Sequence, residues 1–210
     1  MKKKLNCIKT ILFPNHKINF FVIAILFLGV ISGAIFSNII DLNNQKLVID
    51  KINLFINNIN NNEINVIQAL KNSLIINFSY SIVIWILGLT IIGIIINIFL
   101  LYIKGFIFGF SLSSFIITFS YKGIILSFLY TIFGQLLNLI VIMIITIYSI
   151  MFTTNLIKQI FKNKQTINIL NFFKNYSLIL LITTIISILS SINEVFLFPA
   201  LTKLIIKLFI

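Results

Sequence analysis

Three polar side chains stand inside stretches of the sequence that are otherwise almost entirely apolar. Glu194 lies in ILSSINEVFLFPAL, shortly before Pro199, and Gln135 and Asn138 lie three positions apart in another apolar run. Polar groups inside a membrane are costly and mark ion or proton sites, bridges between helices or partner contacts. The Gln135–Asn138 spacing puts both amides on one helix face, where they favour a bridge between helices over a polar path. The Glu194 carboxylate is either an ion or proton site, or a structural pair or partner contact.

The titratable residues that most enzymes use are scarce in this sequence. It has one histidine, His16, and one cysteine, Cys7, both in the N-terminal region, and Glu194 is the one acidic residue within the apolar runs. A serine hydrolase triad, a histidine-based metal site and a carboxylate pair each need groups that this sequence does not bring together. The sequence therefore predicts a protein that is not an enzyme and that uses no cofactor and no metal.

The composition predicts an all-α integral membrane protein. Of 210 residues, 60% are hydrophobic and only 10% are charged, and the mean hydropathy is +1.13. A soluble domain of this length needs a more polar surface. All 16 basic residues are lysines and the net charge is +12, which is better explained by membrane topology than by a phosphate-binding face. We therefore expect contact with membrane lipid and none with nucleic acid.

Apolar runs divide the chain into about five crossings, each of which needs roughly 20 apolar residues in a helix. The second run is long and ends at Lys104–Gly105, and the third run is short. The fourth run is too long for one simple crossing, so we expect a break at Gly134–Gln135. The predicted fold is a polytopic helical membrane protein with about five transmembrane helices, one or two of them short or broken. The runs cover residues 19–40, 74–103, 105–120, 123–157 and 175–198.

The lysine distribution predicts the orientation of this single membrane domain, residues 1–210. Five crossings place 10 lysines on one side, and six lysines with three acidic residues on the other. Because lysine is enriched in cytoplasmic segments, the N-terminus and a basic loop at 158–174 are predicted to be cytoplasmic. A helical hairpin at 41–73 and the C-terminus are predicted on the extracytoplasmic side. This topology puts Glu194 near the outer end of its helix, where a carboxylate costs less, and favours a structural pair or partner contact.

Two pairs of glycines occur at four-residue spacing in the apolar runs. Gly29 and Gly33 form GVISG, and Gly105 and Gly109 form GFIFG. Small residues at this spacing let two helix backbones approach closely in a membrane. The pattern predicts close helix packing, either within one chain, which we favour, or across a homodimer.

Four segments in order resemble the stage II sporulation protein M family of membrane proteins. GVISGAIFSNII resembles the glycine-bearing first helix, and NFSYSIVIWILGLTIIG followed by LLYIKGFIFGFSLSSF resembles the central signature. GQLLNLI lies where the family has a polar Gln/Asn segment, and INEVFLFPAL resembles its final motif of a glutamate followed by a proline. The order and spacing agree along nearly the whole chain. In one departure, the sequence has Ile140 and Val141 where the family often has a proline.

The resemblance implies a scaffold and not a reaction. Family members in spore formers belong to the engulfment machinery, where they hold the stage II sporulation proteins D and P at the septal membrane, and these partners remodel peptidoglycan. The chain is thus expected to be a non-catalytic scaffold that recruits cell-wall hydrolases, with Glu194 and Pro199 as the final family signature. The alternative is a transporter or channel subunit that uses the intramembrane side chains of Gln135, Asn138 and Glu194.

Overall fold

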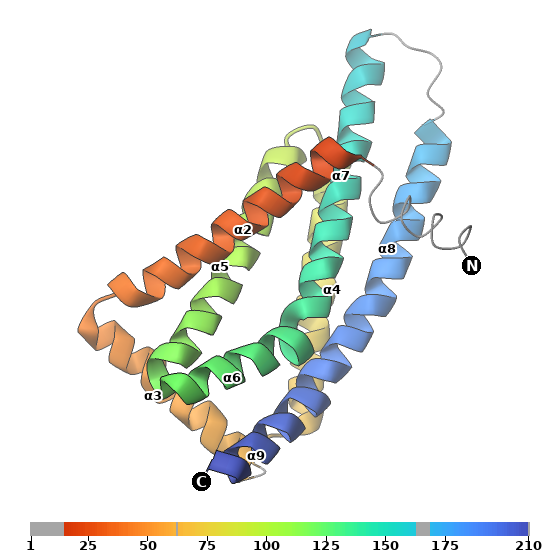
Figure 1. Ribbon diagram of the computed structural model, residues 1–210. Coiled ribbons are helices and arrows are strands. Elements are labelled where there is room, and N and C mark those ends of the chain that lie inside the picture. Colours follow the sequence, from red (N-terminus) through yellow and green to blue (C-terminus); the bar gives the residue numbers. More distant parts are fainter. Residues whose placement is uncertain (1–14, 62, 163–168, 210) are drawn as a thin grey trace.

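The computed structural model describes residues 15–61, 63–162 and 169–209. In these ranges the chain forms helices joined by short turns and has no β-strand, which confirms the predicted all-α fold (Figure 1). The elements are α2 (His16–Ile39), α3 (Leu42–Asn60), α4 (Val66–Gly88), α5 (Gly93–Phe119), α6 (Tyr121–Leu129), the π-helical turn η1 (Tyr130–Gln135), α7 (Leu136–Lys162), α8 (Ile169–Ile192), the π-helical turn η2 (Asn193–Leu197) and α9 (Phe198–Phe209).

Five helical stretches are long and apolar enough to cross a membrane, as predicted. In Figure 1, α2, α4, α5, α7 and α8 run with different tilts between the same two ends of the molecule. One end carries the turn at residues 89–92 and is called the turn end below; the other carries α3, α6 and α9 and is called the α3 end. The five stretches are His16–Ile39, Val66–Gly88, Gly93–Phe119, Tyr121–Ile160 and Leu170–Lys207.

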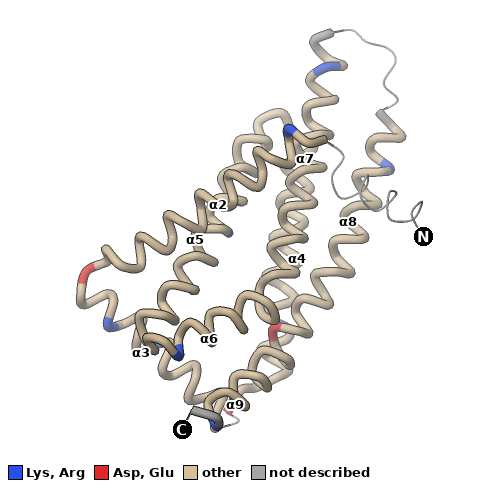
Figure 2. Tube along the Cα trace, in the orientation of Figure 1, with Lys and Arg blue, Asp and Glu red and all other residues tan. Residues whose placement is uncertain are grey.

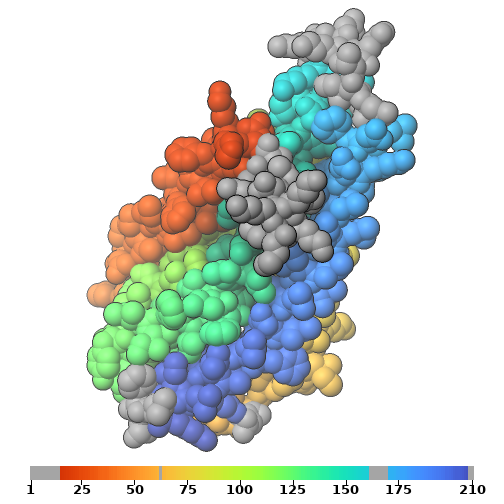
Figure 3. Space-filling view, turned by 45° about the vertical axis from the view of Figure 1, so that its right-hand side comes forward, coloured from red at the N-terminus to blue at the C-terminus, as the bar shows by residue number. Residues whose placement is uncertain are grey.

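The outer surface of these spans is apolar. Figure 2 shows most of the charged residues near the two ends of the bundle, with long uncharged stretches between them. Large side chains on the flanks are exposed, among them Phe27, Phe99 and Leu181 at 59%, 60% and 65%. In water such an apolar surface would promote aggregation, whereas in a bilayer it contacts lipid hydrocarbon. Figure 3 shows α2 along one flank of this surface and α8 along the other.

The helix boundary expected at Lys104–Gly105 is wrong. α4 ends at Gly88 and α5 begins at Gly93, so the turn lies within the run that we expected to be one long crossing. The Thr90 hydroxyl accepts a hydrogen bond from the Gly93 N–H at 3.1 Å and so satisfies one of the free N–H groups at the start of α5. Because the turn residues are mostly apolar, hydropathy does not reveal it. Lys104 therefore lies within the membrane-spanning helix α5.

The break expected at Gly134–Gln135 is present as the π-helical turn η1. The short helix α6 precedes it, and α7 then runs on as a full crossing. A π-helical turn disturbs the regular hydrogen-bond ladder and bends the chain. Figure 1 shows α6 lying across the α3 end before α7 rises away from it. A further sharp bend precedes α6 at Ser120, whose φ of 51° is uncommon for a residue other than glycine.

The last crossing also contains a π-helical turn, and its helix does not end with the predicted run at residue 198. The chain stays helical from α8 through η2 into α9, which begins at Phe198. Proline has no N–H to donate to the preceding turn, so it is tolerated at the start of a helix and next to an irregular turn. α9 contacts both α3 and α6. The C-terminal helix therefore packs on the α3 end of the bundle.

The segment predicted as a hairpin at 41–73 consists of α3 and the first two turns of α4. The two helices meet at a short connection, where the Asn65 side chain accepts from the Gln68 N–H at 3.1 Å and caps α4. Of the residues of α3, only Ile56 and Ile59 are buried. α3 is thus a helix that lies against the bundle and is largely exposed.

The basic segment at 158–174 is helical at both of its ends. α7 extends to Lys162 and α8 begins at Ile169. The remaining loop residues, 163–168, lie outside the described residues.

The two glycine pairs pack α2 closely against α5 within one chain, as favoured above. Gly29 and Gly33 on α2 face Gly105 and Gly109 on α5, and a Cβ atom on any of the four would meet backbone atoms of the other helix. At Gly105 that atom would lie 2.6 Å from the Leu26 carbonyl oxygen. The glycines therefore serve the contact between α2 and α5, where their side-chain positions are buried.

We expect Gly33→Ala and Gly109→Ala each to destabilise the protein, because the added methyl group meets backbone that cannot rotate away. Overpacking costs about 1–3 kcal/mol, and it exceeds the ~1 kcal/mol that alanine gains over glycine in a helix. The measurement is thermal unfolding in detergent, followed by the fluorescence of Trp85, which packs against the main core.

The control for this experiment is Gly134→Ala. Its new methyl group would lie 3.2 Å from the Tyr130 side chain and would meet no backbone atom of another helix within 4 Å among its three nearest neighbours. Equal melting temperatures for the two test variants and the wild type would contradict the α2–α5 packing.

Candidate functional site

Glu194 accepts hydrogen bonds from two side chains on other elements. The Gln135 Nε2 donates to its Oε1 at 2.8 Å, and the Ser73 hydroxyl donates to its Oε2 at 2.6 Å. Gln135 is the last residue of η1, Glu194 lies in η2 and Ser73 lies in α4. One carboxylate thus joins three membrane-spanning stretches that are far apart in the sequence.

Two buried asparagines extend this arrangement into the bundle. The Asn138 Nδ2 donates to the Asn77 Oδ1 at 2.6 Å and to the Gln135 Oε1 at 3.5 Å. The Asn77 Nδ2 donates to the Ser191 hydroxyl at 3.1 Å. Hydrocarbon offers no partner to such groups, so each bond between helices stabilises their packing. We call the six residues the polar junction: Ser73, Asn77, Gln135, Asn138, Ser191 and Glu194.

The two π-helical turns position the central pair of this junction. η1 and η2 contact each other directly, and they carry Gln135 and Glu194 respectively. Each turn interrupts the regular 3.6-residue period, so the side chains on it point where a straight α-helix would not place them. On α4 the position is ordinary: Ser73 and Asn77 are four residues apart and share one face. The junction therefore joins two irregular turns to a regular helix.

Lys104 places a positive charge among the same spans. Its Nζ lies 5.5 Å from the centroid of the Tyr80 ring in a cation–π contact. The Tyr80 hydroxyl in turn donates to the Leu100 carbonyl oxygen at 2.6 Å. Lys104 and Glu194 attract each other electrostatically, so the two opposite charges partly offset each other's cost inside the membrane.

A cavity of about 240 Å³ reaches Glu194 at the α3 end. Phe55 of α3, Tyr130 of η1 and Pro199 of α9 contribute to its wall. Glu194 is therefore only partly buried, whereas Asn138 behind it is 1% exposed. The junction is accessible at its carboxylate and closed toward the interior of the bundle.

A second set of interior hydrogen bonds lies closer to the turn end. The Asn97 Nδ2 donates to the Ser149 hydroxyl at 2.5 Å and to the Ile84 carbonyl oxygen at 3.0 Å. The Thr153 hydroxyl donates to the Gly88 carbonyl oxygen at 2.6 Å. These bonds join α4, α5 and α7, so the helices are linked by polar contacts near both ends.

The structure brings together three of the residues that the sequence identified, namely Glu194, Gln135 and Asn138. Pro199 lines the cavity beside them, whereas the four glycines form the separate α2–α5 contact and Lys104 lies on α5. The sequence pattern does not single out the two serines and the asparagine that complete the junction. Ser73 and Asn77 are four residues apart on α4, but this signal is weak in a chain so rich in asparagine, and Ser191 lies on another helix, α8.

The junction suits hydrogen bonding that fixes helices relative to one another, and its carboxylate is also able to hold a proton or a cation. Among the described residues, no group of three or more His, Cys, Asp or Glu side chains is placed to bind a metal ion. A single carboxylate whose oxygens are taken up by an amide and a hydroxyl is best suited to a structural role.

The fold and the junction define a polytopic helical membrane protein whose spans are joined by interior hydrogen bonds. The family model described as stage II sporulation protein M matches residues 22–199. This range holds most of the chain and the whole polar junction, so the chain belongs to the stage II sporulation protein M family, as its motifs predicted. It is therefore a sporulation-related, multi-pass membrane protein. No curated protein and no solved structure matches the chain.

We expect Glu194→Gln to destabilise the protein. Either Gln135 or Ser73, which both donate to the carboxylate, would then face an amide N–H₂ group in place of an acceptor. An unsatisfied buried donor costs about 1–3 kcal/mol. Gln135→Glu is expected to do the same by placing two carboxylates side by side. The double variant exchanges the two groups and restores each donor–acceptor pair, so its melting temperature should exceed that of both single variants.

Thermal unfolding in detergent measures this cycle, with Glu63→Gln as the control because that carboxylate has an exposed hydrogen bond, from Asn61 at 3.4 Å. Additive losses in the double variant would show that Gln135 and Glu194 do not interact.

Proposed function

We propose that the protein is a non-catalytic membrane scaffold of a peptidoglycan-remodelling complex, which recruits cell-wall hydrolases to the septal membrane during engulfment. The observation that carries this proposal is the family match over residues 22–199. The proposed partners are the stage II sporulation proteins D and P, or other membrane-anchored wall hydrolases. A bundle whose polar groups are engaged in joining helices supports a structural role over a catalytic one.

The proposed orientation places the N-terminus in the cytoplasm and the α3 end outside it. Once Lys104 is assigned to a span, the 10 lysines predicted for the cytoplasmic side become nine (10 − 1 = 9), against six on the α3 side. Asp41, Asp50 and Glu63 also belong to the α3 side. The excess of lysine on the N-terminal side supports this orientation, with α3 and the C-terminus facing the cell wall.

α3 provides the surface that we assign to the partners. Its Leu42, Leu47 and Leu54 side chains are 75%, 60% and 55% exposed. Exposed apolar side chains on an amphipathic helix at the end of the spans favour contact with another protein or with the bilayer surface. In the proposed orientation this helix is among the parts of the chain nearest to wall-remodelling enzymes.

Tagged protein purified from sporulating cells in mild detergent is expected to bring down membrane-anchored wall hydrolases, identified by mass spectrometry. Leu42→Ser combined with Leu54→Ser should reduce this capture several-fold while leaving the melting temperature unchanged, because both side chains are exposed. The matched control is Asn43→Ser combined with Asn44→Ser on the same helix. A protein that purifies alone, while other envelope complexes remain intact, would contradict the scaffold.

A transporter or channel subunit is the second candidate, favoured by the two facing π-helical turns. Interrupted helices that meet within a bilayer form substrate and ion sites in many transporters. This candidate predicts ion or solute flux in proteoliposomes, which Glu194→Gln should abolish and Glu63→Gln should leave unchanged. The absence of flux under a range of gradients would exclude it.

A further inference from the structure

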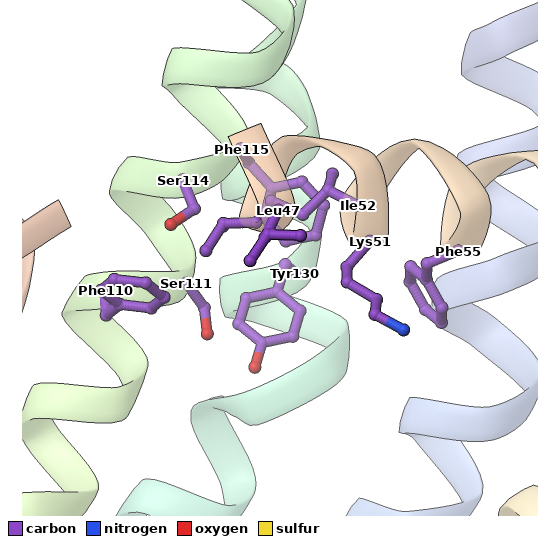
Figure 4. A pocket seen from close by; sticks show the side chains of 10 residues that line it. Leu47, Lys51, Ile52, Phe55, Phe110, Ser111, Ser114, Phe115 and Tyr130 are labelled. Carbon is purple, nitrogen blue, oxygen red and sulfur yellow. The ribbon is translucent and has the colours of Figure 1, made fainter. Parts of the chain in front are cut away.

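A larger cavity lies between α3, α5 and η1, and the scaffold proposal gives it no role. Its volume is about 480 Å³ (Figure 4), within the range of roughly 300–1,000 Å³ that small-molecule sites occupy. Phe110 and Phe115 of α5 and Ile52 and Phe55 of α3 make much of its wall apolar. The cavity lies at the α3 end, where the membrane spans finish.

Most of the polar groups of this cavity lie toward one side, and the exception is the Ser114 hydroxyl. In Figure 4 the polar tips of Lys51, Ser111 and Tyr130 point the same way, while Leu47 and Phe115 lie on the opposite side. Lys51 is the one charged side chain among the residues that line the cavity. The wall therefore combines a largely apolar chamber with a single positive charge and two hydroxyl groups along one edge, while the third hydroxyl group, that of Ser114, lies apart from them.

This combination matches the chemistry of an anionic lipid. An apolar chamber of this size can hold a hydrocarbon chain, whereas a small soluble anion has no apolar part to bury in it. The ammonium group at its edge complements the net negative charge of an anionic headgroup, which a zwitterionic lipid or an uncharged apolar ligand lacks. At the end of the spans, hydrocarbon chains and headgroups are both within reach.

We propose that this cavity binds one acyl chain of an anionic phospholipid, with Lys51 holding the phosphate and the hydroxyls of Ser111 and Tyr130 beside it. Phe55 and Tyr130 line both this cavity and the smaller one at Glu194. A bound lipid therefore fills the space between α3 and the bundle next to the polar junction. It fixes the position of the helix that we assign to the protein partners.

The test compares two lipids with identical acyl chains, phosphatidylglycerol and phosphatidylcholine, added to the full chain in detergent. Native mass spectrometry counts bound lipid, and thermal unfolding measures the stabilisation that results. We expect phosphatidylglycerol to bind more tightly and to raise the melting temperature more. Lys51→Gln should weaken its binding roughly fivefold, the effect of one lysine near an anionic lipid, and Lys46→Gln, at an exposed lysine of the same helix, should not.

The chamber itself is tested by Ser111→Phe, which fills it without removing charge. This variant should bind neither lipid, whereas Ser113→Phe on the same helix, outside the cavity lining, should bind phosphatidylglycerol like the wild type. Equal affinity of the wild type for the two lipids would overturn the proposal. This comparison uses the wild-type protein alone, so it does not depend on whether a variant folds. Unchanged binding by Lys51→Gln or by Ser111→Phe would also overturn it.

Discussion

The carboxylate and the three amides of the polar junction must find hydrogen-bond partners inside a bilayer that supplies none, and the arrangement of the spans that carry them follows from this constraint. Glu194 accepts from Gln135 and Ser73, and Asn77 and Asn138 bond to each other behind them. These hydrogen bonds form only when α4, the two π-helical turns and α7 are in their observed positions, and even then the buried Asn138 Oδ1 has no partner among the described residues. A shift of one helix along another would leave a buried donor or acceptor unpaired, which makes the register of this part of the bundle specific.

The α2–α5 pair is held by a different interaction. There the glycines remove side chains from the contact, so the backbones approach and van der Waals packing stabilises the pair. Such packing favours close contact but distinguishes poorly between similar registers, because it carries few directional bonds. Val22, Leu26 and Leu101 of this pair then pack in the same core cluster as Ile142 and Ile145 of α7, which ties it to the hydrogen-bonded helices.

The sequence predicts the class of fold and the number of crossings because both depend on hydropathy summed over about 20 residues. A misplaced boundary of a few residues changes that sum little. It predicts the break at Gly134–Gln135 because the apolar run is too long for one crossing. It does not predict the turn at 89–92, because these four residues are mostly apolar and do not lower the average hydropathy of the run. It also takes Lys104 as a helix end, although a lysine inside a span is acceptable when its ammonium group contacts the face of an aromatic ring, as it does here at Tyr80.

Glu194 is evident in the sequence, whereas its hydrogen-bond partners are not. A carboxylate in an apolar run stands out in any composition, whereas serine and asparagine residues are unremarkable in this one. Their role appears only when η1 and η2 are seen to face each other, and that contact joins residues about 60 positions apart. Long-range pairing of irregular turns depends on the whole packing, so no local pattern encodes it.

These interactions divide the molecule into a fixed part and a more loosely attached part. The five spans are joined by glycine packing and by directional hydrogen bonds, while α3 buries only two of its side chains and lies over two cavities. Local stability follows buried contacts, so α3 is the element that opens at the lowest free energy. A scaffold benefits from this division, since the bundle fixes its place in the membrane while α3 adjusts to what binds it. α3 contacts the bundle at α5 and at α9, and its Phe55 lines the same cavity as Glu194, so a change in the position of α3 alters the space beside the polar junction.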